Sequence, residues 1–350
     1  MPRVYFAVPG DIETRTGGAL YDRKVIEALR EDGWWVELLT WPASFPFPNE
    51  VDRDAVDDSL AAVPDGALVV IDGLALGVLS GLARREAQRL RLVALVHHPL
   101  ALETGLSPNI AAEFAASERD ALASCRAVIV TSETTAAIVE HAFDVPGAMI
   151  TVAAPGVDIV PPAPRGERRP GPVRLLAMGS INPRKAHHVL VDALSRIADL
   201  DWTCTIAGSL ERDPETADDL KQQVADLGLT DRIAVVGEVS EAEAASLYAW
   251  ADIFTLASLY EGYGMVFSEA MACGLPIVAT TGGAIPEVVG AEAGLLVEPG
   301  DAEAFAEALR ALVEGPDRRA LLAEGARRAG ASLTGWDRTA EQIAACLDRL

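Results

Sequence analysis

The stretch "DIFTLASLYEGYGMVFSEAMACGLPIVATTGGAIPEVV", residues 252–289, decides the fold because it contains all the parts of a β–α–β unit. "DIFTLAS" (252–258) and "PIVATT" (276–281) are short apolar runs, as expected of parallel strands that are buried on both faces. Between them, "MVFSEAMACG" (265–274) reads as a helix that follows a glycine-rich loop. The stretch therefore predicts two parallel strands joined by a helix.

The same alternation of apolar runs and helical patterns continues along the whole chain of 350 residues. Domains of roughly 150 residues are typical, so this length predicts two of them. The other strand-like runs are "RVYFAVP", "WVELLT", "ALVVID", "LRLVALVHH", "AVIVTS" and "MITVAAP" in the first half, and "VRLLAMGS", "WTCTIAGS", "RIAVVGEV" and "GLLVEPG" in the second. We therefore predict an α/β fold with two tandem Rossmann-like domains and a cleft between them, where ligands bind at the carboxyl ends of the strands.

A proline-rich stretch, "PGVDIVPPAPRGERRPGPVR" (155–174), divides the two halves because it can form neither a helix nor a central strand. It predicts a first domain at 1–160, a linker at 161–172 and a second domain at 173–334. The last segment, 335–350, reads as a helix that packs back on the first domain.

The formal net charge of −23 and the short basic run "RGERR" (165–169) argue against nucleic acid or anionic lipid as a partner. No run of about 18 apolar residues predicts a membrane span, and the start of the chain lacks the apolar region of a signal peptide. The four cysteines are far apart and form no CxxC pair, so we expect reduced thiols and no zinc site. These features predict a cytoplasmic protein.

Two glutamates, Glu261 and Glu269, flank the start of the predicted helix at 265–274. The first-turn backbone N–H groups of such a helix, here those of Met265 and Val266, can bind an anion. Gly264 allows a tight turn and a close approach of backbone to ligand, and a carboxylate accepts hydrogen bonds from neighbouring hydroxyls. The stretch therefore predicts a site for a phosphate that lies between a sugar and a ribose.

The spacing of these glutamates resembles the E-x7-E motif of retaining glycosyltransferases with the GT-B fold, specifically family 4, and the resemblance covers nearly the whole chain. It implies a metal-independent hexosyltransferase without a cofactor, which uses a UDP-, GDP- or ADP-sugar as donor and a hydroxyl acceptor. It assigns donor binding to the second domain and acceptor binding to the first. Within the motif, it makes Glu261 catalytic and Gly264, Met265, Val266 and Glu269 donor-binding.

Two segments of the first domain also resemble the family. "TGGALYDRKVIEAL" is similar to its glycine-rich loop, which implies that the amides of Gly17 and Gly18 reach the donor phosphates and the acceptor. "HHPLALETGL" is similar to its histidine-bearing segment, which implies that His98, rather than His97, acts at the reacting sugar. Neighbouring residues of a strand point to opposite faces, so only one of the two histidines can face the cleft.

In the second domain, "MGSINPRKAHHVLVDAL" resembles the G-R-x-x-x-R-K-G phosphate grip of the family. Lys185 matches its lysine and is expected to stabilise the leaving diphosphate, with Arg184 beside it. The sequence departs from the pattern at Ser180, where the family has arginine, and at Ala186, where it has glycine. Two further donor-binding residues, Gly208 and Val239, are placed by "IAGSLERDP" and "VVGEVSEAE".

Other interpretations are a non-catalytic sugar-nucleotide binding protein and a sugar-nucleotide epimerase of the same fold; the E-x7-E pattern argues against the epimerase. The D-x-D sequence at 52–54 lies in a polar helical stretch rather than after a strand, so we do not assign it to a metal. The acidic composition favours a small soluble acceptor or a polysaccharide over a membrane lipid.

Overall fold

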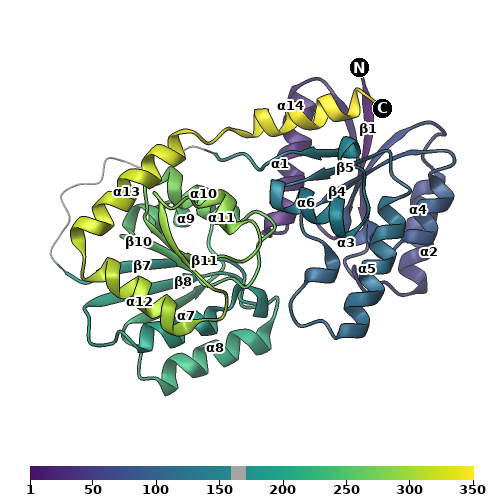
Figure 1. Cartoon of the computed structure of the whole chain (residues 1–350). Helices are drawn as coiled ribbons and strands as arrows, with labels where there is room; N and C mark the ends of the chain where they lie inside the picture. Colours follow the sequence, from purple (N-terminus) through teal and green to yellow (C-terminus); the bar gives the residue numbers. More distant parts are fainter. Residues whose placement is uncertain (159–170) are drawn as a thin grey trace. The chain divides into compact units, whose positions relative to one another are not determined.

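The computed structural model describes residues 1–158 and 171–350, which form two compact units (Figure 1). Unit 1 comprises Met1–Gly156 and Thr334–Leu350, and unit 2 comprises Val157–Leu333. The basic run at 165–169 and most of the predicted linker lie outside the described residues.

Unit 1 contains a six-stranded parallel sheet with the strand order β2-β1-β3-β4-β5-β6. Its strands are β1 (Arg3–Pro9), β2 (Trp35–Trp41), β3 (Leu68–Asp72), β4 (Arg91–Val96), β5 (Ala127–Val130) and β6 (Ile150–Val152). Its helices are α1 (Gly17–Glu31), α2 (Glu50–Ala61), α3 (Gly73–Leu76), α4 (Ser80–Glu86), η1 (Leu100–Leu102), α5 (Pro108–Leu122), α6 (Glu133–Ala142), η2 (Gly147–Met149) and α14 (Trp336–Leu347).

Unit 2 repeats this architecture with a second six-stranded parallel sheet in the order β12-β11-β10-β7-β8-β9. Its strands are β7 (Val173–Met178), β8 (Trp202–Ala207), β9 (Ile233–Gly237), β10 (Ile253–Leu256), β11 (Ile277–Thr280) and β12 (Gly294–Val297). Its helices are η3 (Pro183–Lys185), α7 (His187–Ser195), α8 (Pro214–Asp226), α9 (Glu241–Trp250), α10 (Met265–Ala272), α11 (Ile285–Val288), α12 (Ala302–Val313) and α13 (Pro316–Ala331).

The strands are apolar on both faces because each sheet is covered on both faces. In β7, the neighbouring residues Leu175 and Leu176 are both fully buried, but they belong to different hydrophobic clusters. One cluster includes residues of α7 and α12, and the other includes residues of α10. Successive residues of a strand point to opposite faces, so the sheet of unit 2 is sandwiched between helices. The predicted α/β fold with two Rossmann-like domains is confirmed.

Helix α14 belongs to unit 1, although it follows unit 2 in the sequence. The Trp336 ring packs edge-on against Tyr21 of α1, with ring centroids 5.6 Å apart, and Thr339 Oγ1 donates to the carbonyl of Ala154 at 2.7 Å. Gly156 lies against the start of α14, because a Cβ atom there would come within 2.3 Å of the Trp336 backbone nitrogen. The two points at which the chain leaves and re-enters unit 1 are therefore adjacent.

The end of β4 differs from its prediction in a way that affects the histidines. The run "LRLVALVHH" predicts a strand through His98, but β4 ends at Val96. Val96 pairs with Val130, the last residue of β5, so His97 has no residue of a neighbouring strand opposite it. Both histidines therefore lie in the loop that follows β4, and the alternation of strand faces does not decide which way they point.

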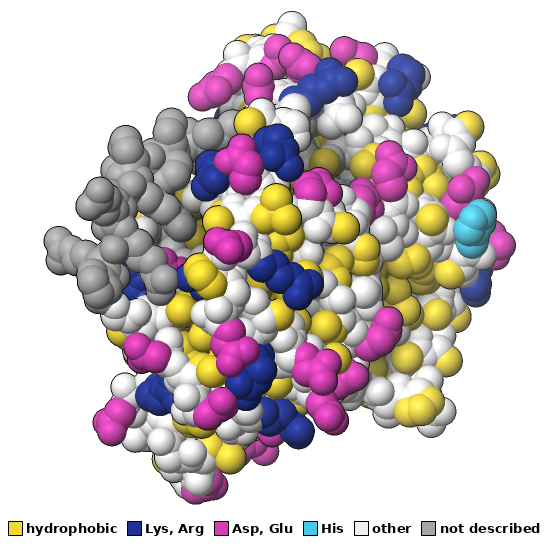
Figure 2. Space-filling model, turned by 60° about the vertical axis from the view of Figure 1, so that its left-hand side comes forward, with side chains coloured by type: hydrophobic (Ala, Val, Ile, Leu, Met, Phe, Trp, Pro, Cys, Tyr) yellow, Lys and Arg dark blue, Asp and Glu magenta, His cyan; other side chains and the backbone are white. Residues whose placement is uncertain are grey.

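Charged side chains of both signs are mixed on the face in Figure 2, where Asp and Glu lie among Lys and Arg in the coloured part of the surface. Among the described residues, no helix combines the length and the apolar character needed to cross a bilayer.

Candidate active site

The predicted donor-binding residues of unit 2 come from loops at the carboxyl edge of its sheet. Strand β10 lies between β7 and β11, so the loops that follow these three strands are neighbours. The loop after β7 carries Arg184 and Lys185, and the loop after β10 carries Glu261. The carboxyl edge of a parallel sheet is where open α/β folds bind ligands.

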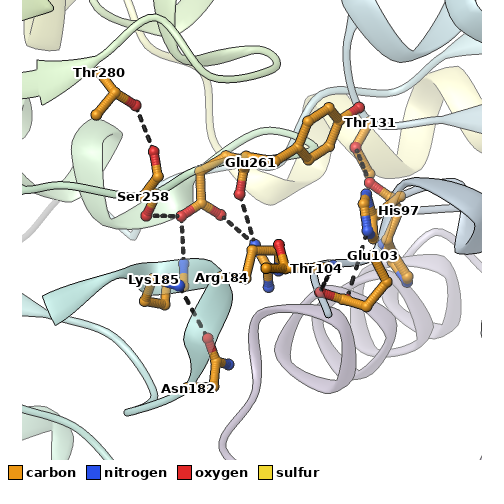
Figure 3. A network of polar contacts seen from close by, with 12 residues as sticks. His97, Glu103, Thr104, Thr131, Asn182, Arg184, Lys185, Ser258, Glu261 and Thr280 are labelled. Atoms are coloured by element: carbon orange, nitrogen blue, oxygen red, sulfur yellow. Dashed lines mark hydrogen bonds and ion pairs between the residues drawn. The ribbon is translucent and has the colours of Figure 1, made fainter. Parts of the chain in front are cut away.

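The carboxylate of Glu261 is the centre of a buried polar network (Figure 3). Its Oε1 accepts hydrogen bonds from Lys185 Nζ at 2.6 Å and from Ser258 Oγ at 2.6 Å. Its Oε2 accepts one from Arg184 Nη1 at 3.1 Å. Two cations thus surround one carboxylate, which leaves a net positive charge of about one at this edge of the sheet.

Burial alone would raise the pKa of Glu261, but the charges of Lys185 and Arg184 lower it to about 2. The residue is only 4% exposed. Glu261 is therefore ionised near neutral pH and can only accept hydrogen bonds, so it suits a ligand that donates hydroxyl groups.

The glycines of the "TTGGAIPEVV" segment are explained by how closely it packs against the Glu261 loop. Gly283 forms a parallel bridge with Glu261 and has a φ of 62°, and a Cβ there would lie 2.3 Å from the Glu261 carbonyl oxygen. A Cβ on Gly282 would lie 2.3 Å from the carbonyl oxygen of Leu259. Only bare backbone fits here, and Ala284 N donates to the Glu261 carbonyl at 2.9 Å to complete the contact.

The loop between β7 and α7 holds Lys185 by local hydrogen bonds and packing. Asn182 Oδ1 accepts from the backbone N–H of Lys185 at 3.0 Å, and Ala186 adopts the left-handed conformation with φ 47° and ψ 43°. This left-handed backbone explains why the family has glycine at this position, since glycine adopts such a conformation without strain. Gly208 also has a packing role, because a Cβ there would lie 1.8 Å from the Gly179 carbonyl oxygen.

Helix α10 presents the remaining residues of the E-x7-E stretch. Gly264 is its N-cap with φ 92° and supplies no side-chain cap, and Met265 and Val266 form its first turn. The Glu269 Oε2 atom accepts a hydrogen bond from the Tyr248 hydroxyl of α9 at 2.6 Å. Burial raises the pKa of Glu269, although the hydrogen bond from Tyr248 opposes this.

In unit 1, the predicted residues lie in the loops after β1 and β4. Gly17 and Gly18 open α1, which Thr16 caps by accepting from Ala19 N at 3.1 Å. A Cβ on Gly18 would lie 3.5 Å from the His97 ring, so the glycine-rich turn and the histidine loop are in contact. The His98 ring lies 3.5 Å from the carboxylate of Glu103.

The structure brings Lys185, Arg184 and Glu261 into direct contact, and it places Gly264, Met265, Val266 and Glu269 on one helix. Val239 lies between β9 and the N-cap of α9. Sequence reasoning missed Ser258 and Tyr248, which bond directly to the two glutamates. Ser258 is the last residue of the predicted strand at 252–258, and a polar residue at a carboxyl end could have indicated it, whereas no sequence pattern distinguishes Tyr248 from other tyrosines.

Comparison with protein-family models gives two matches. The family described as glycosyl transferases group 1 matches residues 164–329, and the one described as glycosyltransferase family 4 matches residues 65–160. Together they span most of both units.

Named relatives align over most of the chain. A D-inositol 3-phosphate glycosyltransferase of Pseudarthrobacter chlorophenolicus is 33% identical over 296 residues, which are 77% of this chain and 70% of that protein. An MMP alpha-(1->4)-mannosyltransferase of Mycolicibacterium hassiacum is 29% identical over 327 residues, which are 89% and 77% of the two chains.

Solved structures share the whole fold. Sucrose-phosphate synthase of Thermosynechococcus elongatus has a TM-score of 0.84 at 22% identity and covers 100% of this chain and 99% of its own. HepE of Anabaena, in complex with UDP-glucose, has a TM-score of 0.73 at 21% identity and covers 99% and 100%.

Proposed function

The chain belongs to the glycosyl transferases group 1 family, and we propose that it moves a sugar from a nucleotide diphosphate sugar to a hydroxyl acceptor, with retention at the anomeric carbon. The observation that carries this proposal is the contact of Lys185 and Arg184 with the buried carboxylate of Glu261. A leaving diphosphate develops negative charge, and a preorganised cationic site stabilises that charge without reorganisation.

Each residue of the network has a distinct role in this proposal. Lys185 and the first-turn amides of α10 bind the diphosphate, and Glu261 accepts hydrogen bonds from sugar hydroxyls. Arg184 supplies the second positive charge that the family places at position 180, where this chain has Ser180. The hydrogen bond from the Arg184 guanidinium to Glu261 supports this role, because it directs the positive charge of Arg184 toward the site rather than into solvent. Glu269 binds the ribose, and the diphosphate is neutralised by protein groups without a metal ion.

Unit 1 supplies the acceptor side of the reaction in this proposal. The amides of Gly17 and Gly18 approach the donor phosphates and the acceptor, and His98 acts at the reacting sugar. The name of the Pseudarthrobacter relative includes an inositol phosphate, which supports a small soluble acceptor, while a polysaccharide fits the motifs equally. We include a cytoplasmic location in this proposal, because the four cysteines, Cys125, Cys204, Cys273 and Cys346, are far apart in the sequence and form no CxxC pair.

The donor can be identified by thermal shift, because a ligand that binds only the folded state raises the melting temperature. UDP-, GDP- and ADP-sugars are compared, with UDP-glucose first because HepE binds it. The stabilising donor is then incubated with candidate acceptors, and NMR of the product gives the anomeric configuration. Product formation with retention in the presence of EDTA supports the proposal. Epimerisation of the donor, or binding without transfer to any hydroxyl acceptor, contradicts it.

A further inference from the structure

The loop that carries His98 is held at both ends by buried acids from distant parts of unit 1. His97 begins the loop directly after β4, and η1 begins at Leu100, two residues after His98. Asp22 of α1 and Asp72 at the end of β3 contact His97, whereas Glu118 of α5 contacts Leu100. Asp72 and Glu118 lie outside the family segments quoted above, and Asp22 lies within "TGGALYDRKVIEAL", where the resemblance gives it no role.

The first anchor fixes His97 from three elements. Its Nε2 lies 2.9 Å from Asp22 Oδ1 and 3.7 Å from Asp72 Oδ2, and its ring packs edge-on against Tyr21 at 5.0 Å. Its carbonyl accepts a hydrogen bond from Thr131 Oγ1 at 3.3 Å (Figure 3). Asp22 and Asp72 are 1% and 6% exposed, so water does not compete for their contacts with the His97 ring. These contacts therefore restrict the rotation of the ring.

The contacts of this anchor depend on the protonation of His97 and Asp72. The titratable groups that face His97 are Asp22, Asp72 and Tyr21, and the two carboxyl groups are hydrogen bonded to each other. Burial and the charge of Asp22 raise the pKa of Asp72 to about 7. Burial would lower the pKa of His97, but Asp22 and Asp72 raise it to about 9. Near neutral pH, His97 is therefore an imidazolium paired with the Asp22 carboxylate.

A divalent cation is the alternative occupant, since the three side chains place ligand atoms within 4.8 Å of one another. The direct hydrogen bonds favour protons, because the Asp22–His97 and Asp22–Asp72 contacts already satisfy the atoms that a metal would need.

The second anchor lies on the other side of His98. Glu118 is 1% exposed, its Oε2 accepts from the backbone N–H of Leu100 at 3.1 Å, and its carboxyl group also accepts from that of Ala101. Its Oε1 has no hydrogen-bond partner among the described residues, so these two amides are its polar contacts there. The carboxyl group thereby fixes the start of η1, and only Pro99 separates this point from His98.

We propose that Asp22, Asp72 and Glu118 are positioning residues, which hold the two ends of the segment from His97 to Ala101 and so orient His98 toward the reacting sugar. This inference rests on the proposed function, because it needs His98 to act at that sugar. It differs from a purely structural role in that loss of an anchor lowers turnover without weakening donor binding.

Three variants at Glu118 and Glu86 test the second anchor. We expect Glu118→Ala to lower kcat about 10-fold or more, to leave the donor KM within about 2-fold, and to speed amide hydrogen exchange at Leu100 and Ala101. Glu118→Gln keeps one acceptor oxygen and should restore most of both properties. Glu86→Ala is the matched control, because Glu86 is also buried but pairs with Arg85 and Arg89. It should leave kcat and loop exchange unchanged even if it lowers stability.

Asp22→Asn tests the first anchor through pH. Removal of the Asp22 charge lowers the pKa of His97, so the alkaline fall in kcat should move to lower pH than in the wild type. An unchanged pH profile contradicts this anchor. So does a stoichiometric divalent ion that elemental analysis finds in the wild type and not in Asp22→Asn.

The hydrogen-exchange measurement distinguishes a failure of this proposal from a failure of the proposed function on which it rests. Unchanged exchange in Glu118→Ala, or faster exchange with normal kcat, overturns the positioning role while transfer by the wild type stands. A wild type that transfers sugar from no donor overturns the function itself, whatever the exchange shows.

Discussion

Lys185 is the residue whose charge the proposed reaction needs most directly. Its ammonium group contacts Glu261 and lies beside Arg184, so it can stabilise a leaving diphosphate. We expect Lys185→Ala to lower kcat about 100-fold, as for loss of one preorganised donor to a developing anion. Lys221→Ala is the control, since Lys221 is an exposed residue of α8 that pairs with Asp218. Steady-state kinetics that give near-normal turnover for Lys185→Ala would assign the role to Arg184 instead.

Tyr248 is expected to act through Glu269. Tyr248→Phe removes the hydrogen bond to the carboxylate but keeps the ring, which packs against Phe254 at 5.9 Å. We expect affinity for the bare nucleotide diphosphate to fall roughly 10-fold, the equivalent of one hydrogen bond of about 1.4 kcal/mol. Glu269→Ala should cost more.

Calorimetry at two pH values adds a second check on Tyr248. Its hydrogen bond lowers the pKa of Glu269, so Tyr248→Phe raises that pKa further, and the loss of affinity should be greater at pH 6 than at pH 8. Tyr5→Phe, at a buried tyrosine of β1, controls for loss of a hydroxyl in general. Equal affinity of Tyr248→Phe and wild type at both pH values would show that Tyr248 has no part in donor binding.

Ala186 carries backbone strain that the usual glycine of the family avoids. The left-handed conformation costs an L-residue roughly 1–2 kcal/mol. Replacement by glycine removes this cost, but the greater conformational entropy of glycine in the unfolded chain offsets about half of the gain. Because the buried methyl group of Ala186 is also lost, we expect Ala186→Gly to stabilise the protein only slightly, by less than about 1 kcal/mol in urea unfolding. Ala245→Gly, at an exposed position inside α9, should instead destabilise it by about 1 kcal/mol. A loss of stability in both variants would contradict the strain.

At the scale of elements, the buried titratable groups around the end of β4 should make the stability of the protein depend on pH. Asp72, His97 and Glu118 have folded-state pKa values of about 7, 9 and 8, each above the value in an unfolded chain. The folded state therefore binds more protons, and the stability that these groups contribute at low pH is lost as the pH rises through these values.

Between pH 6 and pH 9.5, we expect the free energy of unfolding to fall by about 1.4 kcal/mol per pH unit for each proton released. Glu118→Gln should reduce this slope near pH 8. Glu261→Gln should leave it unchanged, because the pKa of Glu261 is about 2 and this group stays ionised throughout the range. Urea denaturation at several pH values measures the slope, and a stability that rises with pH would refute the assignment.

The strands could be predicted from the sequence because a strand that is buried on both faces consists of a continuous run of apolar residues. Each of the twelve apolar runs interpreted as strands corresponds to a strand of one of the two sheets. The end of β4 could not be placed, because it depends on where β5 ends rather than on the residues at 97 and 98.

The candidate site was predictable only where a motif marked it. Lys185, Arg184 and Glu261 were identified, and the structure brings them together, while their roles remain proposals. Their mutual ion pairs were not predicted, because residues about 76 positions apart meet only through strand order. The contacts of Asp22 with His97 and of Glu118 with Leu100 are non-local in the same way, and no local pattern records them.

At the scale of the whole molecule, Trp336 is expected to be the main link between α14 and the rest of unit 1. It is 9% exposed and packs against Tyr21 and the backbone of Gly156. Trp336→Ala should destabilise unit 1 by about 3–5 kcal/mol, the usual cost of removing a buried large aromatic side chain. Trp35→Ala is the control, since Trp35 is 57% exposed in the same unit. Calorimetric unfolding that shows equal losses for both would mean that α14 contributes little.

The position of α14 in the sequence also determines when unit 1 can be completed during translation. Residues 157–333 leave the ribosome before Trp336, so unit 2 has its full sequence while unit 1 still lacks one helix. At about 5–20 residues per second, this delay lasts roughly 10–35 s. During that time the apolar surface around Tyr21 lacks its cover, and protein synthesis rather than folding sets how long a nascent chain exposes this surface to chaperones.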